Sequence, residues 1–151
     1  MKVRNDFVSN SSSTSFIIMM EDVEISKLDK KFFRLIGRCK YLYFYSKESE
    51  YSEELVKEVK NAFGKHIEVD ENFINLDLNG IKLWNKSTSE LVKKILEATA
   101  NVTCSYGCDD CGVFVGEAIQ ICTALELLYG IVPEGDDHFN YSSIKNLEVE
   151  L

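Results

Sequence analysis

The stretch Ile74-Asn-Leu-Asp-Leu-Asn-Gly-Ile-Lys-Leu-Trp84 carries the clearest fold signal in this sequence. Apolar and polar residues alternate before and after Asn79-Gly80, and this alternation is typical of strands that bury one face. An Asn-Gly pair between two such runs favours a two-residue hairpin turn. We therefore predict a β-hairpin over residues 74–84.

Helical and strand patterns follow one another on both sides of this predicted hairpin. A serine that can cap a helix stands before three of the apolar runs with helical spacing. The predicted helices cover residues 26–37, 52–63, 87–96 and 113–129, and further strands cover residues 16–20, 41–45 and 147–151. Because the hairpin interrupts the strand–helix rhythm, we predict an α+β fold with a mixed sheet and about four helices.

Length and composition favour one folded domain over residues 1–151. Apolar residues make up 45% of the chain and charged residues 28%, as in ordinary globular proteins. Residues 1–15 end in the Ser-rich run Ser9-Asn-Ser-Ser-Ser-Thr-Ser15, which we predict to be a leading loop. The basic start is followed by no apolar stretch, and no run approaches the length of a membrane span, so we expect a cytoplasmic protein without membrane contact.

Negative charge is concentrated in the last third of the chain. Residues 1–100 hold sixteen basic and sixteen acidic residues, whereas residues 101–151 hold nine acidic residues and one lysine, Lys145. The net charge of −8 therefore comes entirely from this part. Direct binding of nucleic acid requires clustered Lys and Arg, so this distribution disfavours it and favours a basic protein partner.

Three cysteines in eight residues suggest a metal site. They stand in Cys104-Ser-Tyr-Gly-Cys108-Asp-Asp-Cys111, where Gly107 allows a tight turn. Zinc is held by four thiolate or imidazole ligands, and the start of the following helix would favour the thiolate form. We therefore predict that a loop over residues 104–111 binds zinc and is pinned by it.

The fourth zinc ligand is a choice between two residues. We predict His138, because it lies in a loop near the end of the last helix, and we take Cys122 as the alternative. A site with four protein ligands is structural. A site with water as the fourth ligand would permit metal-dependent hydrolysis, for which Glu117 is a candidate base, but no spacing singles it out.

Acidic residues surround the predicted metal ligands in the sequence. We expect them to form a docking face for a basic protein, with an on-rate that falls as salt rises. The predicted partner-binding residues are Asp109, Asp110, Glu134, Asp136 and Asp137.

Tyr41, Tyr43 and Tyr45 alternate along one predicted strand and therefore share one face of the sheet. Three interpretations remain open for them. Such a row can pack beneath a helix, stack on the bases of single-stranded nucleic acid, or form a protein interface.

The segment from Lys2 to Ile17 resembles the first residues of many small uncharacterised proteins of Gram-positive bacteria and their prophages. By size, charge and predicted metal, the whole chain also resembles the zinc-containing anti-CRISPR inhibitors that phages carry against type II CRISPR nucleases. This likeness is an analogy of properties and not of aligned residues.

No catalytic motif is present in the sequence, so we expect a binding protein and not an enzyme. The analogy implies an inhibitor of a bacterial nucleic-acid-handling enzyme. The alternatives are a small zinc-binding regulatory protein with another protein partner and a metal-dependent hydrolase.

Overall fold

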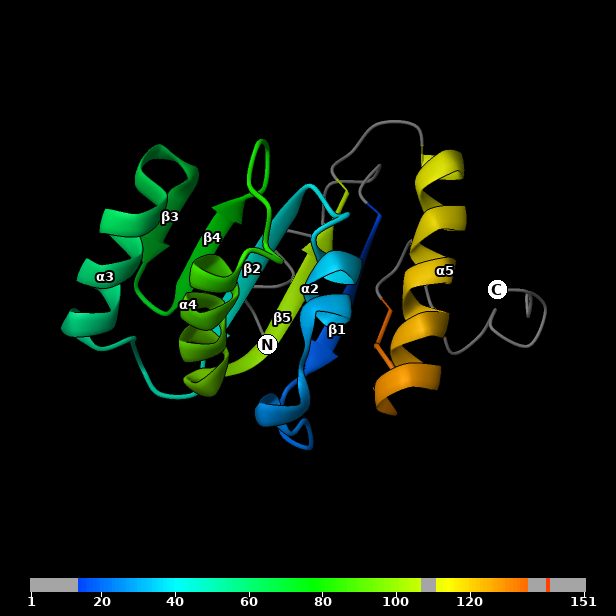
Figure 1. Ribbon diagram of the computed structural model, residues 1–151, viewed down its shortest axis with the longest axis horizontal. Helices are drawn as coiled ribbons and strands as arrows, with labels where there is room; N and C mark the ends of the chain where they lie inside the picture. Colours follow the sequence, from blue (N-terminus) through cyan, green and yellow to red (C-terminus); the bar gives the residue numbers. More distant parts are fainter. Residues whose placement is uncertain (1–13, 107–110, 136–140, 142–151) are drawn as a thin grey trace.

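The fold is α+β, with one five-stranded sheet and four α-helices (Figure 1). The computed structural model describes residues 14–106, 111–135 and 141, and the statements below concern these residues. The strands are β1 (Ser15–Met19), β2 (Tyr41–Ser46), β3 (Ile67–Asp70), β4 (Phe73–Asp77) and β5 (Thr99–Ser105), the helices are α2 (Lys30–Ile36), α3 (Glu53–Phe63), α4 (Lys86–Glu97) and α5 (Cys111–Tyr129), and two short 3₁₀ helices are η1 (Ile25–Lys27) and η2 (Gly64–His66).

The strands follow the order β1-β5-β2-β4-β3, and each of the four neighbouring pairs is antiparallel. The prediction of a mixed sheet was therefore wrong for the described strands. The prediction of an α+β fold with four helices is confirmed.

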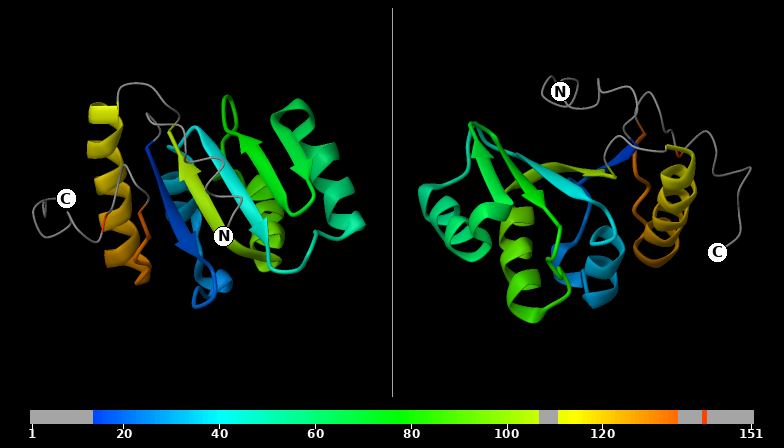
Figure 2. Two further views of the ribbon diagram at one scale, coloured as in Figure 1. Left: turned by 180° about the vertical axis from the view of Figure 1, so that it is seen from behind. Right: turned by 90° about the horizontal axis from the view of Figure 1, so that it is seen from above.

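Helices α2, α3 and α4 lie on one face of the sheet, and α5 lies beyond β1, next to α2 (Figures 1 and 2). The core forms between this helical layer and alternate strand residues. Leu42 and Phe44 of β2 are fully buried in it, with Ile74 and Leu76 of β4 beside them. Because side chains alternate along a strand, Tyr41 and Tyr43 point to the opposite face, where no described helix packs.

The predicted Asn-Gly hairpin is not formed. Asn79-Gly80 does make a turn, in which Gly80 has φ +80° and the Ile81 amide donates to the Leu78 carbonyl at 2.9 Å. The next residues do not pair with β4, however, because β2 and β3 already occupy both of its edges. They lead to α4 and bury Leu83 beneath the helices. The hairpin that the sheet contains joins β3 to β4.

The helix starts agree with the sequence patterns at one of three places. Ser52 caps α3, and its Oγ accepts from the Leu55 amide at 3.2 Å, as predicted. Asp29, and not Ser26, caps α2, because residues 25–27 form η1 first. Ser87 lies inside the first turn of α4, whose N-cap is Asn85.

Strands β3 and β5 were missed in the sequence. β5 lies in the interior of the sheet between β1 and β2, and polar side chains such as Asn101 and Thr103 are buried on one of its faces. A strand with buried polar residues lacks the apolar alternation that identifies a strand in a sequence. Of the predicted leading loop at residues 1–15, residues 1–13 lie outside the described residues, and Ser15 is already the first residue of β1. The predicted strand at residues 147–151 also lies outside the described residues.

A buried hydroxyl pair joins the end of α4 to the loop before α3. The Thr99 Oγ1 donates to the Ile95 carbonyl at 2.6 Å, so Tyr51 donates its own hydroxyl to Thr99 at 2.8 Å. We expect Thr99→Val to lower the free energy of unfolding by about 1–3 kcal/mol, because it leaves a buried donor without its acceptor. Urea unfolding measures this loss. Adding Tyr51→Phe should restore part of the lost stability, and a fully additive double mutant would contradict the pairing.

Candidate partner-binding site

Cys104 is a core residue of β5 and not part of a metal-binding loop. Its side chain is fully buried, opposite Leu42 on one side and Phe16 on the other. Burial raises the pKa of the Cys104 thiol, and a hydrogen bond with the Cys39 thiol raises it further. Cys104 therefore packs as a small apolar residue of the core.

The predicted zinc site is contradicted by the described structure. Among the side chains that the structure describes, in residues 14–106, 116–135 and 141, no group of three or more His, Cys, Asp or Glu is placed to hold a metal ion. Cys122, the alternative ligand, is buried in the core, where burial raises its pKa. Cys111 is the first residue of α5, and Cys108 and His138 lie outside the described residues.

Glu117, the candidate base for a hydrolase, forms an ion pair instead. Its Oε2 accepts from the Arg38 guanidinium at 2.6 Å and 3.0 Å. The pair is partly exposed and connects α5 to Arg38, which lies two residues beyond the end of α2. With no metal-binding group among the described residues, this geometry gives no support to a metal-dependent hydrolase.

One of the five predicted partner-binding acids can be placed. Glu134 is exposed, and its backbone amide and carbonyl each bond to Ile17 at 2.8 Å along the outer edge of β1. Asp109, Asp110, Asp136 and Asp137 lie outside the described residues. The predicted acidic docking face therefore stays a prediction.

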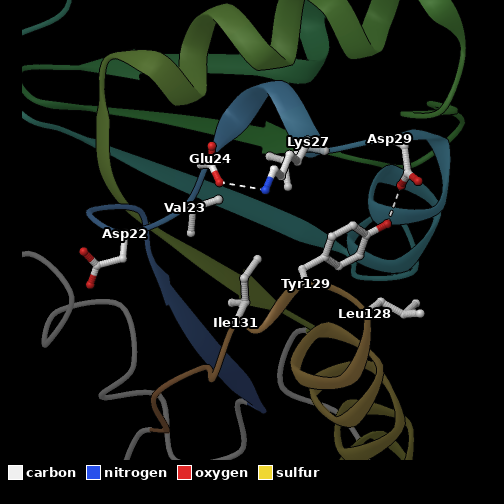
Figure 3. A pocket seen from close by; sticks show the side chains of 9 residues that line it. Asp22, Val23, Glu24, Lys27, Asp29, Leu128, Tyr129 and Ile131 are labelled. Atoms are coloured by element: carbon white, nitrogen blue, oxygen red, sulfur yellow. Dashed lines mark hydrogen bonds and ion pairs between the residues drawn. The ribbon is translucent and has the colours of Figure 1, made fainter.

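Another acidic surface lies between the loop around η1 and the C-terminal end of α5 (Figure 3). It is a groove of about 440 Å³, which we call the acidic groove. Its lining combines three carboxylates with aliphatic side chains from both elements: Asp22, Val23, Glu24, Lys27, Leu28, Asp29, Leu128, Tyr129 and Ile131.

Asp29 joins the two walls of the acidic groove. Its carboxylate caps α2 by accepting from the Phe32 amide at 3.2 Å, and it accepts a second hydrogen bond from the Tyr129 hydroxyl (Figure 3). The bond from Tyr129 lowers the pKa of Asp29 below its ordinary value. This carboxylate is therefore ionised at neutral pH.

The acidic groove has a net negative charge. Its only lining cation, Lys27, already pairs with Glu24 at 3.0 Å, and both side chains of that pair are well exposed. Asp22 and Asp29 remain as the excess negative charges. The last turn of α5 contains no basic residue, so the negative end of its helix dipole adds to the field at Tyr129.

An exposed apolar side chain continues the groove at the end of α5. Leu128, which lines the groove, is 52% exposed. Gly130, with φ +69°, ends the helix, and the chain then enters the groove wall at Ile131. An apolar surface beside ionised carboxylates suits a partner segment that is both apolar and basic.

The sequence does contain a signal for this groove. Glu21-Asp-Val-Glu24 places three acids within four residues of the chain. We overlooked it because residues 1–100 are neutral as a whole. The meeting of this run with Tyr129 is a tertiary contact that no spacing in the sequence reveals.

The face of the sheet away from the helices displays a row of aromatic rings. The ring centroids of Tyr41 and Tyr43 lie 6.3 Å apart, those of Tyr43 and Phe73 lie 6.2 Å apart, and those of Phe73 and Tyr45 lie 5.7 Å apart. Tyr41, Tyr43 and Phe73 are half-buried, and no helix among the described residues lies over this face of the sheet. The described residues therefore give no support to packing beneath a helix, and the three interpretations stay predictions.

None of the helices among the described residues combines the length and the apolar character that crossing a membrane requires.

The resemblance of this chain to anti-CRISPR inhibitors finds no support in comparison with known proteins. No family model, no curated protein and no solved structure matches this chain.

Proposed function

We propose that this chain is a binding protein, not an enzyme, and that it docks a basic segment of a protein partner in the acidic groove. The observation that carries the proposal is the groove itself: two carboxylates that form no salt bridge with a described residue, Asp22 and Asp29, lie beside the exposed apolar surface of Leu128. A Lys or Arg of the partner would pair with the carboxylates, and an apolar neighbour would cover the leucine.

Enzymes that handle nucleic acid are the class of partner that this chemistry fits best. They hold phosphates with clustered Lys and Arg, and such clusters attract a protein whose net charge is −8. A protein bound on such a cluster competes with nucleic acid and therefore inhibits the enzyme. If the partner is instead another basic protein, binding in the same groove would make this chain a regulatory protein that does not inhibit an enzyme.

Binding to a panel of purified bacterial nucleases across a salt series tests the proposal. We expect one or more of them to bind with a Kd that rises with salt, because the long-range part of the attraction is screened. Asp22→Asn combined with Leu128→Ser should weaken that binding about tenfold, through lost charge pairing and lost apolar contact. Both side chains are exposed, so the variant should remain folded.

The matched control is Glu50→Gln combined with Leu127→Ser. It removes one exposed acid in the loop before α3 and one exposed leucine that does not line the groove. We expect this control to bind as the unmodified chain does. Equal weakening in the two variants, binding that ignores salt, or no binding to any basic protein would overturn the proposal. Addition of nucleic acid should displace the chain from a nuclease.

A further inference from the structure

A second groove, lined by basic side chains, lies between the neighbouring helices α2 and α4 (Figures 1 and 2). Its volume of about 350 Å³ is at the small end of the range of about 300–1,000 Å³ that is typical of small-ligand pockets. We call it the basic groove and define it by Asp29, Lys30, Phe33, Trp84, Lys86 and Lys93.

Three lysines converge on the basic groove from two helices. Lys30 is the first residue of α2, and Lys86 is the first residue of α4. Lys93 follows Lys86 by seven positions, which is about two helical turns, so both lie on the same side of α4. Among the described residues, none of the three lysines forms an ion pair. The basic groove therefore gathers positive charges that the described part of the chain does not neutralise.

The acids closest to these lysines do not neutralise them. Asp29 is the only acid among the described residues that line the basic groove, and its carboxylate accepts hydrogen bonds from the Phe32 amide and the Tyr129 hydroxyl. Glu90 lies four residues after Lys86, a spacing that permits an ion pair on a helix, but the described residues contain no such pair. The first turn of α4 contains no acid, so Lys86 lies at the positive end of the helix dipole, where a cation is unfavourable. A bound anion would relieve this repulsion.

An aromatic surface adjoins the lysines. Trp84, the only tryptophan of the chain, is half-buried and lines the basic groove just before α4. The Arg34 guanidinium lies over the Trp84 ring, 5.5 Å from its centre, and this contact holds the indole in place. Phe33 of α2 is buried and lines the same groove. An ordered indole beside three ammonium groups suits a ligand that combines a flat ring with negative charge.

We propose that the basic groove binds a nucleotide with a diphosphate or longer phosphate chain. The phosphates would pair with the three lysines, and the base would stack on the Trp84 indole. An acidic peptide would pair with the lysines but would leave the indole without a flat partner. A nucleic-acid strand is disfavoured, because the net charge of −8 repels a long row of phosphates. This site is separate from the acidic groove, with which it shares only Leu28 and Asp29.

The fluorescence of Trp84 tests the proposal directly, because the chain contains no other tryptophan. We expect ADP to quench this fluorescence saturably, since the base would lie against the indole. N-acetyltryptophanamide titrated with ADP corrects for absorbance and for collisional quenching. Adenosine supplies the base alone and inorganic pyrophosphate supplies the phosphates alone. In calorimetry each of these two should bind about tenfold more weakly than ADP.

Two double variants locate the binding in the basic groove. Lys86→Gln combined with Lys93→Gln should weaken ADP binding about tenfold, through two lost charge-assisted hydrogen bonds. Lys57→Gln combined with Lys60→Gln makes the same change in charge at two exposed lysines of α3 that do not line the groove, and it should bind ADP as the unmodified chain does. The acidic-groove variant Asp22→Asn should also bind ADP unchanged, so failure of that groove and failure of this one are distinguishable.

Four results would overturn the proposal. The first is an absence of saturable quenching by ADP, and the second is equal weakening of ADP binding in the two lysine variants. The third is pyrophosphate that binds as tightly as ADP, which would leave the indole without a role. The fourth is a glutamate-rich peptide or a single-stranded oligonucleotide that binds more tightly than ADP, which would assign the basic groove to a macromolecule.

Discussion

Replacing Phe44 with alanine is expected to lower the free energy of unfolding by about 3–5 kcal/mol, a large fraction of the about 5–15 kcal/mol that is typical of a folded protein. Phe44 is fully buried on β2, with Val102 of β5 and Ile74 of β4 opposite it on the two sides. The lost ring leaves a cavity between the sheet and the helical layer, and the paired strands on either side leave little room for collapse.

Urea unfolding monitored by circular dichroism measures this loss. Leu127→Ala is the control, because its side chain is 66% exposed, and it should change stability by no more than about 0.5 kcal/mol. A Phe44→Ala variant as stable as the Leu127→Ala control would show that the sheet does not bury this face.

Cys104→Ser and Cys104→Val should differ in stability, although each removes the same thiol. The serine hydroxyl would be buried among apolar side chains, and we expect a loss of about 1–3 kcal/mol. Valine is apolar and close to cysteine in size, and it should cost less than about 1.5 kcal/mol. If Cys104 is a core residue, the valine variant should therefore be more stable than the serine variant.

A metal ligand at position 104 predicts a different result. Both variants would then lose the metal and with it a similar, large part of the folding energy. Unfolding curves measured with and without a chelator separate the two cases. Equal, large losses together with chelator sensitivity of the unmodified chain would contradict the core position of Cys104.

Sequence patterns predicted helices correctly where the interaction that stabilises the helix lies within the same few residues as the pattern. The serine before Glu53-Glu54 predicts the start of α3 because the cap bonds an amide only three residues away. The apolar run at residues 113–129 likewise predicts most of α5. Both signals are local, and the rest of the chain does not need to be known to interpret them.

The two clearest motifs failed because their outcome depends on distant residues. Asn79-Gly80 makes its turn, but both edges of β4 are occupied by other strands. Cys104 fits the spacing of a metal loop, but β5 extends through it and buries its side chain beside Cys39, which is 65 residues earlier in the sequence. Neither competing contact has a signature near the motif.

The sequence by itself determined the α+β class, most of the helices and the strands at the start and centre of the sheet, because hydrophobic spacing and helix caps act over a few residues. Only the tertiary structure decided the antiparallel strand order, the core position of Cys104 and the acidic groove. Asp29 meets Tyr129 across 100 residues of chain. Strand pairing and helix packing decide these features, and their energy comes from contacts between residues far apart in the chain.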